Sequence, residues 1–150
     1  YDRVGTTPLL VPGTIIVSAV LWALTLVDQN TPVWAVVTGH IVISLGLALV
    51  FTPLFTASLS SVKPQLYSHG SAILGSVQQI AGAAGVALFV AVMTIQTAAL
   101  SAAGAAPVDA LAAGIRTGFL CGAIISLFAV AASFFVKKPP ADPSMPMMGH

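Results

Sequence analysis

The sequence has 150 residues, of which 57% are hydrophobic and 6% charged, with a mean hydropathy of +1.01 and a formal net charge of +1. A soluble domain carries roughly a quarter charged residues, so this composition excludes an ordinary water-soluble fold and indicates an integral membrane protein with a lipid bilayer as its main partner. The small net charge gives no basic surface for nucleic acid, and the single cysteine, Cys121, excludes an internal disulfide framework.

The chain begins with Tyr1, Asp2 and Arg3 ahead of its first apolar run. This start lacks the basic region and the small-residue cleavage site of a signal peptide. We therefore expect Tyr1 to be a fragment boundary and residues 1–8 to be a cytoplasmic loop.

Four uncharged apolar runs separate the charged residues. They predict an all-α transmembrane fold with four membrane-spanning helices, at about 9–27, 33–57, 72–96 and 115–136. Each run is long enough to cross a hydrocarbon core of about 30 Å at 1.5 Å per residue, whereas a barrel strand needs only about 10 residues. The Pro-rich remainder, 137–150, lacks apolar periodicity and is predicted to be a disordered cytoplasmic tail.

The basic residues fall mostly on one side of this topology. If the chain crosses four times, four of the five share a side: Arg3, Lys63, Lys137 and Lys138. Only Arg116 lies on the other side, where it is expected to reach the lipid headgroups. Because Lys and Arg are enriched in cytoplasmic loops, we predict that both termini and the loop 58–71 are cytoplasmic and that Asp28 and the Ala/Gly-rich stretch 97–114 face outward.

The second run contains His40, the only titratable side chain well inside any run apart from the Cys121 thiol, which is expected to be a small core residue. Ser44 follows one helical turn later on the same face. Ionisable residues in a membrane are candidates for functional sites, so His40 either lies in a substrate pathway or forms a hydrogen bond to a neighbouring helix. Residues that favour close packing or a kink recur every seven positions in this run: Gly39, Gly46 and Pro53.

The third run carries small and polar residues on one helical stripe. The stripe consists of Ser71, Gly75, Gln78, Gly82 and Gly85. Small residues allow another helix backbone to approach closely in lipid. An amide in hydrocarbon is costly unless it is hydrogen-bonded, so Gln78 and the adjacent Gln79 must face protein or a wet cavity. They serve either as hydrogen-bonding groups between helices or as contacts for a transported ligand.

The last run opens with glycines at every fourth position, Gly114, Gly118 and Gly122, a pattern that also favours close helix packing.

Motifs for other chemistry are absent from the sequence, which has no P-loop, dinucleotide fingerprint or nucleophile elbow. His40, His69 and His150 lack metal-ligand spacing. We therefore expect no catalytic residue, no metal site and no cofactor. No Asp or Glu lies inside a run, so a carboxylate proton relay cannot be built from this chain alone.

Three segments resemble one transporter family. The start, Asp2-Arg3-Val4-Gly5, resembles the Asp-Arg-x-Gly cytoplasmic loop motif of the major facilitator superfamily, with Asp2, Arg3 and Gly5 as its motif residues. The segments Tyr67–Ala72 and Gln78–Gly85 resemble the loop and penultimate helix of its fourteen-helix drug:proton antiporters of the EmrB/QacA type, among them the lincomycin-resistance exporters.

This resemblance implies that the four helices are the last four of a transporter in the bacterial cytoplasmic membrane, with the remaining N-terminal helices as partners. It implies a second helix that lines a central cavity, with His40 toward it, and a third helix at the interface between two six-helix bundles. Transport of a small hydrophobic drug-like substrate against protons would follow by rocking of the bundles.

The leading hypothesis is thus the C-terminal part of a proton-driven multidrug exporter, which is not active alone. An alternative is a standalone small four-helix membrane protein with a binding or assembly role. A small four-helix drug pump would need an acidic residue within a span, and an enzyme is disfavoured by the missing motifs.

Overall fold

The computed structural model describes residues 7–28 and 30–136, and within these ranges the regular elements are all helices, which confirms the predicted all-α class. The elements are, in chain order, α1 (Thr7–Leu24), α2 (Val33–Ser60), the short 3-10 helix η1 (Pro64–Leu66), α3 (Tyr67–Ala102) and α4 (Pro107–Ser133). The predicted loop motif of Asp2, Arg3 and Gly5 and the predicted tail 137–150 lie outside the described residues.

Three of the helices, α2, α3 and α4, are long and apolar enough to cross a membrane. α1 is shorter, with 18 residues, and contains Pro12. Its coil continues as a 3-10-type turn, because the amides of Thr25, Leu26 and Val27 donate hydrogen bonds to carbonyls three residues earlier, at 3.0 to 3.3 Å. Four helices are therefore present, and the assignment of α1 as a fourth membrane span is a proposal.

α3 is longer than the apolar run from which it was predicted. Its 36 residues give a length of about 54 Å, against about 30 Å for the hydrocarbon core. The helix ends at Ala102 in a Schellman motif, where Gly104 has a φ of 88° and its amide donates to the carbonyl of Ser101, while the next amide reaches the carbonyl of Leu100. Pro107 then begins α4, at a position where its missing N–H group needs no partner.

A short turn joins α1 to α2. Oδ1 of Asp28 accepts a hydrogen bond from the amide of Asn30 at 2.9 Å and another from the hydroxyl of Thr31 at 3.0 Å. Oγ1 of Thr31 in turn accepts one from the amide of Asp28 at 2.8 Å. Pro32 follows with extended backbone angles and precedes the first turn of α2. These bonds satisfy the polar groups of the connection and fix where the chain reverses.

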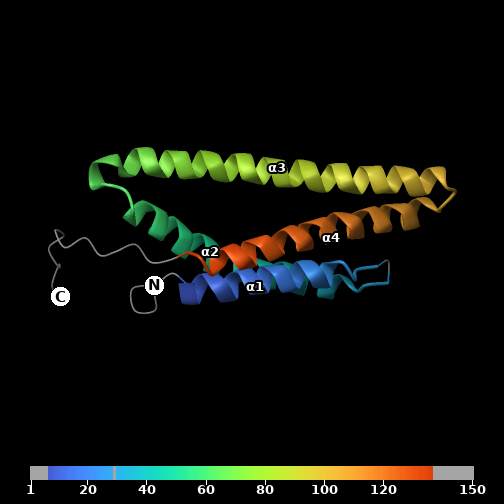
Figure 1. The fold of residues 1–150 in the computed structure, drawn as a ribbon. Helices are drawn as coiled ribbons and strands as arrows, with labels where there is room; N and C mark the ends of the chain where they lie inside the picture. Colours follow the sequence, from blue (N-terminus) through green and yellow to red (C-terminus); the bar gives the residue numbers. More distant parts are fainter. Residues whose placement is uncertain (1–6, 29, 137–150) are drawn as a thin grey trace.

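The helices are arranged around α1 and α4 (Figure 1). α1 packs against both α2 and α4, and α3 packs along α4, whereas α2 and α3 touch little and diverge from their connection. The start of α1, the end of α4 and the α2–α3 connection lie at one end of the molecule, and the α1–α2 and α3–α4 turns lie toward the other. A chain that crosses a membrane four times has this alternation.

Two glycines let the backbones of α1 and α2 approach closely. A Cβ atom on Gly13 would lie 2.9 Å from Cβ of Leu49 and 3.0 Å from the carbonyl oxygen of Gly46. A Cβ atom on Gly46 would lie 2.9 Å from a methyl group of Val17 and 3.2 Å from the carbonyl oxygen of Gly13. Neither position has room for a side chain, as is typical of helix pairs in membranes.

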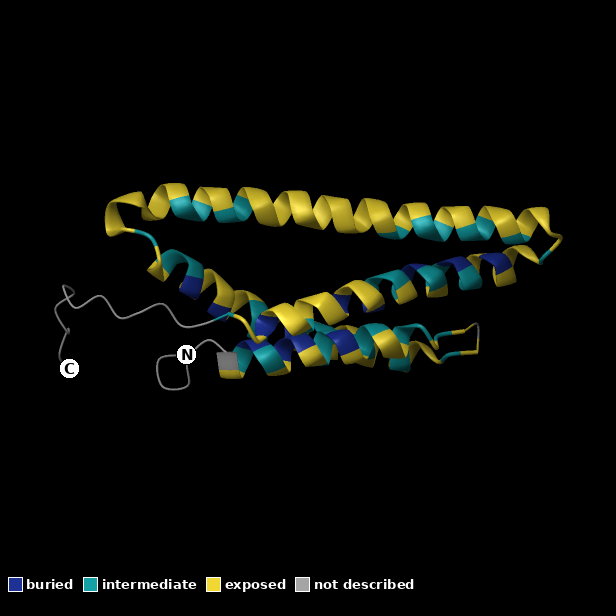
Figure 2. Ribbon diagram, viewed as in Figure 1, coloured by how far each residue is buried: buried dark blue, intermediate teal, exposed yellow. Residues whose placement is uncertain are grey.

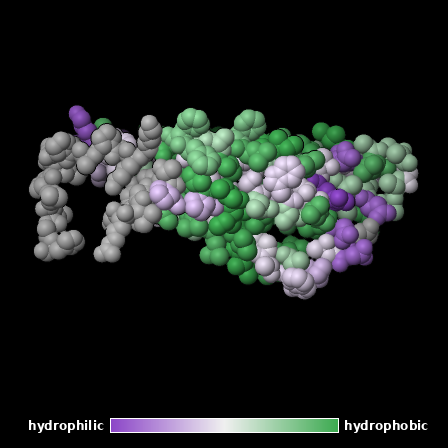
Figure 3. Space-filling view, turned by 60° about the horizontal axis from the view of Figure 1, so that its bottom comes forward, coloured by the Kyte–Doolittle hydropathy of each residue, from purple (hydrophilic) through white to green (hydrophobic). Residues whose placement is uncertain are grey.

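Few side chains are buried, and no residue of α3 is (Figure 2). The buried apolar residues of the described chain are Leu10, Ala57, Ala110 and Ala123. Hydrophobic atoms cover much of the face in Figure 3, and hydrophilic atoms gather toward the end where the α1–α2 turn lies. An exposed apolar surface of this extent indicates contact with lipid or with further protein.

Candidate functional site

An open cavity of about 990 Å³ lies between the second half of α2 and the first half of α3, and we refer to it as the α2–α3 cavity. Most of its wall is apolar and includes Phe51, Phe55, Leu74 and Val77. The polar side chains in the lining are Thr52, Thr56, Ser58, Gln78 and Gln79. An apolar wall with a few polar groups is typical of sites that bind small organic molecules.

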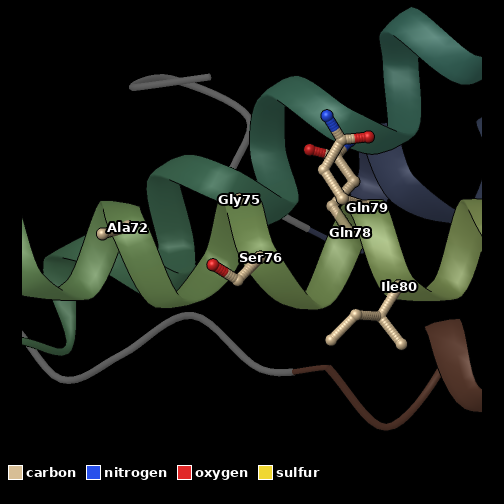
Figure 4. Close-up of a pocket in the computed structure, with 6 residues that line it drawn as sticks. All are labelled: Ala72, Gly75, Ser76, Gln78, Gln79 and Ile80. Carbon is tan, nitrogen blue, oxygen red and sulfur yellow. The ribbon is translucent and has the colours of Figure 1, made fainter.

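Gln78 and Gln79 lie on the α2 side of α3. Figure 4 shows both side chains extending toward α2, while Ile80 points away from it. Both also border a second, shallower hollow along α3 with Gly75 and Ser76. Within residues 7–28 and 30–136 neither amide has a hydrogen-bond partner, so both are available to a ligand or to another helix.

His40 and Ser44 lie farther along α2. Both are exposed, and the Ser44 hydroxyl donates a hydrogen bond to the carbonyl of His40 at 2.8 Å. At 3.6 residues per turn they share a face of α2 with Phe51 and Phe55, which line the α2–α3 cavity. Helical periodicity therefore puts His40 and Ser44 on the same side of α2 as the cavity, although neither belongs to its lining.

The predicted stripe on α3 has no partner helix within the described part of the chain. A Cβ atom added to Gly75, Gly82 or Gly85 would meet no atom within 4 Å. Ser71 donates its hydroxyl to the carbonyl of Ser68 at 3.0 Å, within the same helix. Gln78, the remaining member of the stripe, lines the α2–α3 cavity. The three glycines of the stripe are thus open within the part of the chain that the structure describes.

Two of the three α4 glycines do form a close interface, and α3 is the partner. A Cβ atom on Gly114 would lie 2.6 Å from the carbonyl oxygen of Met93 and would also clash with Oγ1 of Thr97. A Cβ atom on Gly118 would lie 2.7 Å from the ring of Phe89. That ring packs edge-on against Phe119, with centroids 5.3 Å apart. Gly122 has open space around it.

Hydroxyl pairs between α1 and α4 are a feature that the sequence reasoning missed. The hydroxyl oxygens of Ser18 and Ser126 lie 2.8 Å apart, and those of Thr14 and Ser133 lie 3.2 Å apart. All four residues are buried. The signal was present, because Thr14 and Ser18 are four residues apart and Ser126 and Ser133 are seven apart, so each pair shares a helix face.

Arg116, which was predicted to reach the lipid headgroups, has a protein partner. Its side chain is exposed, and Nε donates a hydrogen bond to the backbone carbonyl of Thr25 at 3.0 Å. Carbonyls at the end of a helix have no partner within that helix. Arg116 of α4 therefore caps the C-terminal end of α1.

No cluster of residues suited to hold a metal ion occurs over the described ranges.

Relatives among curated proteins match nearly the whole chain. It is 32% identical over 143 residues to the lincomycin resistance protein LmrB of Listeria monocytogenes serovar 1/2a, a match that covers 92% of this chain and 30% of that protein. It is 28% identical to LmrB of Bacillus subtilis strain 168, over 95% of this chain and 31% of that protein. It is 35% identical to the MFS-type transporter YcnB of the same strain, over 93% of this chain and 29% of that protein. No family model and no solved structure matches.

The chain spans about 30% of the length of these relatives. They are transporters rather than enzymes, which agrees with the expectation from the missing catalytic motifs. The resemblance seen in Tyr67–Ala72 and Gln78–Gly85 is confirmed by a match that extends over more than nine-tenths of the chain. The chain therefore belongs to the major facilitator superfamily of membrane transporters and is related to its lincomycin-resistance members.

Proposed function

We propose that the chain is the C-terminal part of a proton-driven multidrug efflux transporter that works by alternating access. The observation that carries this proposal is the similarity to lincomycin-resistance proteins over 92% of the chain. Since the chain spans about 30% of those proteins, the proposal assigns the remaining helices of the transporter to an N-terminal portion.

In this proposal the α2–α3 cavity forms part of the path of a small hydrophobic, drug-like molecule. Its volume, about 990 Å³, lies at the upper end of the range of roughly 300 to 1,000 Å³ for small-molecule sites. The rings of Phe51 and Phe55 offer apolar contact, and the amides of Gln78 and Gln79, which have no partner among the described residues, offer hydrogen bonds to the substrate. His40 and Ser44 would extend the path along the same face of α2.

The open glycines of the α3 stripe support the proposed helix interface. Gly75, Gly82 and Gly85 leave room for the backbone of another helix, and small residues favour such close approach in lipid. The proposal assigns these glycines, together with Ser71, to contact with the N-terminal helices, so that the two halves can rock against each other around a central site.

Proton coupling in this proposal depends on residues outside this chain. The uncharged runs contain no Asp or Glu, and a proton relay through a membrane is commonly built on such carboxylates. The chain alone is therefore expected to transport nothing. Its proposed location is the bacterial cytoplasmic membrane, with Lys63 on the cytoplasmic side because cytoplasmic loops are enriched in basic residues.

The test is a comparison of the complete transporter with the 150-residue chain in a drug-sensitive bacterium that lacks its own efflux pumps. The complete transporter is expected to raise resistance to lincosamides or other apolar drugs, and its efflux of a fluorescent substrate should stop when the proton gradient is collapsed. The chain alone, present in the membrane at an equal level, is expected to give neither effect. Resistance from the chain alone, or efflux that survives loss of the gradient, would contradict the proposal.

A further inference from the structure

The α3–α4 hairpin extends past the α1–α2 turn (Figure 1). Both helices of the hairpin are longer than a membrane requires, with 36 residues in α3 and 27 in α4, against about 20 for a hydrocarbon core of about 30 Å. Even at the average tilt of about 20° for membrane helices both remain longer than the core, so part of each lies outside the hydrocarbon, and the charges decide which part.

Arg116 and Lys137 set the depth of α4. The residues between them, 117–136, are all uncharged, and their length of about 30 Å matches the hydrocarbon core. The hydrogen bond from Arg116 to the carbonyl of Thr25 places this arginine beside the end of α1, where the chain turns back. A guanidinium group is costly at depth and stable at the membrane surface. The level of Arg116 thus marks one surface of the membrane.

Contacts between α4 and α3 show which residues of α3 lie at the same depth as Arg116. Gly114 lies against Met93, and Gly118 lies against the ring of Phe89. Arg116, halfway between these glycines, is therefore level with the stretch of α3 between Phe89 and Met93. The last turns of α3 and the first turns of α4 lie beyond that level, on the side of the α3–α4 turn.

The composition of the hairpin changes at the same level. Residues 94–115 are rich in alanine, and their large apolar side chains are few: Ile95, Leu100, Val108, Leu111 and Ile115. Residues 72–93 of α3 have twice as many: Ile73, Leu74, Val77, Ile80, Val86, Leu88, Phe89, Val90, Val92 and Met93. Alanine has the highest helix propensity and needs little burial, so the outer segment can stay helical in water.

We infer that residues 94–115 form a rigid helical projection that stands in water beyond the membrane surface, on the side of the membrane opposite Lys63. From Pro107 to Ile115 the projection rises about 13 Å at 1.5 Å per residue. It is held together by the contact of Gly114 with Met93 and Thr97 and by Ala110, which is fully buried. The inference depends on the membrane location of the chain and not on drug transport.

The experiment measures thiol labelling of the complete transporter in intact cells with a membrane-impermeant maleimide, after Cys121→Ser removes the cysteine of this chain and any others are removed likewise. Two matched pairs of exposed positions decide it. In each pair the residues lie 14 positions apart on one helix face: Ala98→Cys against Ala84→Cys on α3, and Leu111→Cys against Ile125→Cys on α4. The outer member of each pair should label on the order of tenfold faster or more, because a thiol reacts as the thiolate, in water.

Ala103→Cys in the turn is the positive control, since it lies outside the hydrocarbon whatever the depth of the helices. The inference is overturned by the following result: Ala103→Cys is labelled, but Ala98→Cys and Leu111→Cys are labelled as slowly as Ala84→Cys and Ile125→Cys. If Ala103→Cys labels only in inside-out vesicles, the assigned side is wrong, and the same pairs measured in those vesicles decide whether the projection exists. Each result can be read whether or not the transporter exports a drug.

Discussion

The hydroxyl oxygens of Ser18 in α1 and Ser126 in α4 lie 2.8 Å apart in a buried interface between these two helices. Oγ of Ser126 also lies 2.6 Å from the carbonyl oxygen of Ala123, within its own helix. Seven residues farther along α4, Ser133 meets Thr14 in the same way at 3.2 Å. The two pairs together fix the register of α1 against α4.

Loss of the Ser18–Ser126 contact should destabilise this interface modestly. For the variants Ser18→Ala, Ser126→Ala and their combination, we expect a coupling free energy of about 0.6 kcal/mol, the average for hydrogen bonds between membrane helices. The measurement is reversible unfolding of the complete transporter in bicelles, evaluated as a double-mutant cycle. Ser44→Ala is the matched control, because the Ser44 hydroxyl bonds only within α2. Coupling of Ser18 to Ser44 as large as to Ser126 would contradict the assignment.

Substitution of the α4 glycines should separate those that touch α3 from the one that does not. Gly114→Ala introduces a methyl group 2.6 Å from the carbonyl oxygen of Met93, a backbone atom that cannot move aside alone. Overpacking of this kind costs about 1 to 3 kcal/mol. We expect Gly114→Ala to lower the thermal unfolding midpoint of the purified transporter, with a smaller drop for Gly118→Ala, whose neighbour is the side-chain ring of Phe89.

Gly122→Ala is the control for that series, because the same substitution meets open space there. Its unfolding midpoint should equal or exceed that of the unsubstituted transporter, since alanine favours the helix. Equal losses at Gly114 and Gly122 would show that the interface with α3 does not have the geometry described.

The two cavity glutamines should affect transport more than stability. Gln78→Leu and Gln79→Leu remove amides that line the α2–α3 cavity, and a typical hydrogen bond makes a net contribution of about 0.5 to 1.5 kcal/mol. We expect a severalfold rise in the KM of drug efflux measured in vesicles, with normal amounts of protein in the membrane. Gln96→Leu is the matched control, on the same face of α3 but away from the cavity. A similar KM change at Gln96 would argue against substrate contact at the cavity.

His40→Ala should weaken drug resistance without lowering the level of the transporter in the membrane. The reason is its position on the cavity side of α2, where its exposed side chain has no partner among the described residues. The measurement is the minimal inhibitory concentration, compared with protein amount by immunoblot. His69→Ala, in the first turn of α3, should leave both unchanged. Unchanged resistance of His40→Ala at normal expression would assign His40 to packing.

The sequence predicted the helices better than their ends. Charge-free runs have to be helical in lipid because every backbone polar group needs a partner, so the existence of α2, α3 and α4 followed from the charges alone. The end of α3 did not, because hydropathy falls off near Gln96 while the alanines after it continue the helix to Ala102. The high helix propensity of alanine extends α3 beyond the apolar run from which it was predicted.

The packing partners were harder to predict than the packing surfaces. The spacing of Gly114 and Gly118 indicated a close contact, yet nothing in the pattern pointed to Phe89 and Met93 as the other side. The reach of Arg116 to Thr25 was missed for a related reason, since the acceptor is a backbone carbonyl, which every residue has. Such contacts depend on how the helices are placed and not on local sequence.

The bonds that join α1 to α4 also set an order of events during synthesis. Thr14 and Ser133 are 119 positions apart in sequence, and Ser18 and Ser126 are 108 apart. α1 can meet α2 through Gly13 and Gly46 as soon as both helices have left the ribosome, but Thr14 and Ser18 can meet their partners only after α4 has been synthesised. Before α4 is present, the hydroxyl of Thr14 can donate a hydrogen bond to the carbonyl of Val11 in its own helix, at 2.9 Å. The contact between α1 and α4 can therefore form only after α2 and α3 have been synthesised, so it is the last of these helix contacts to become possible.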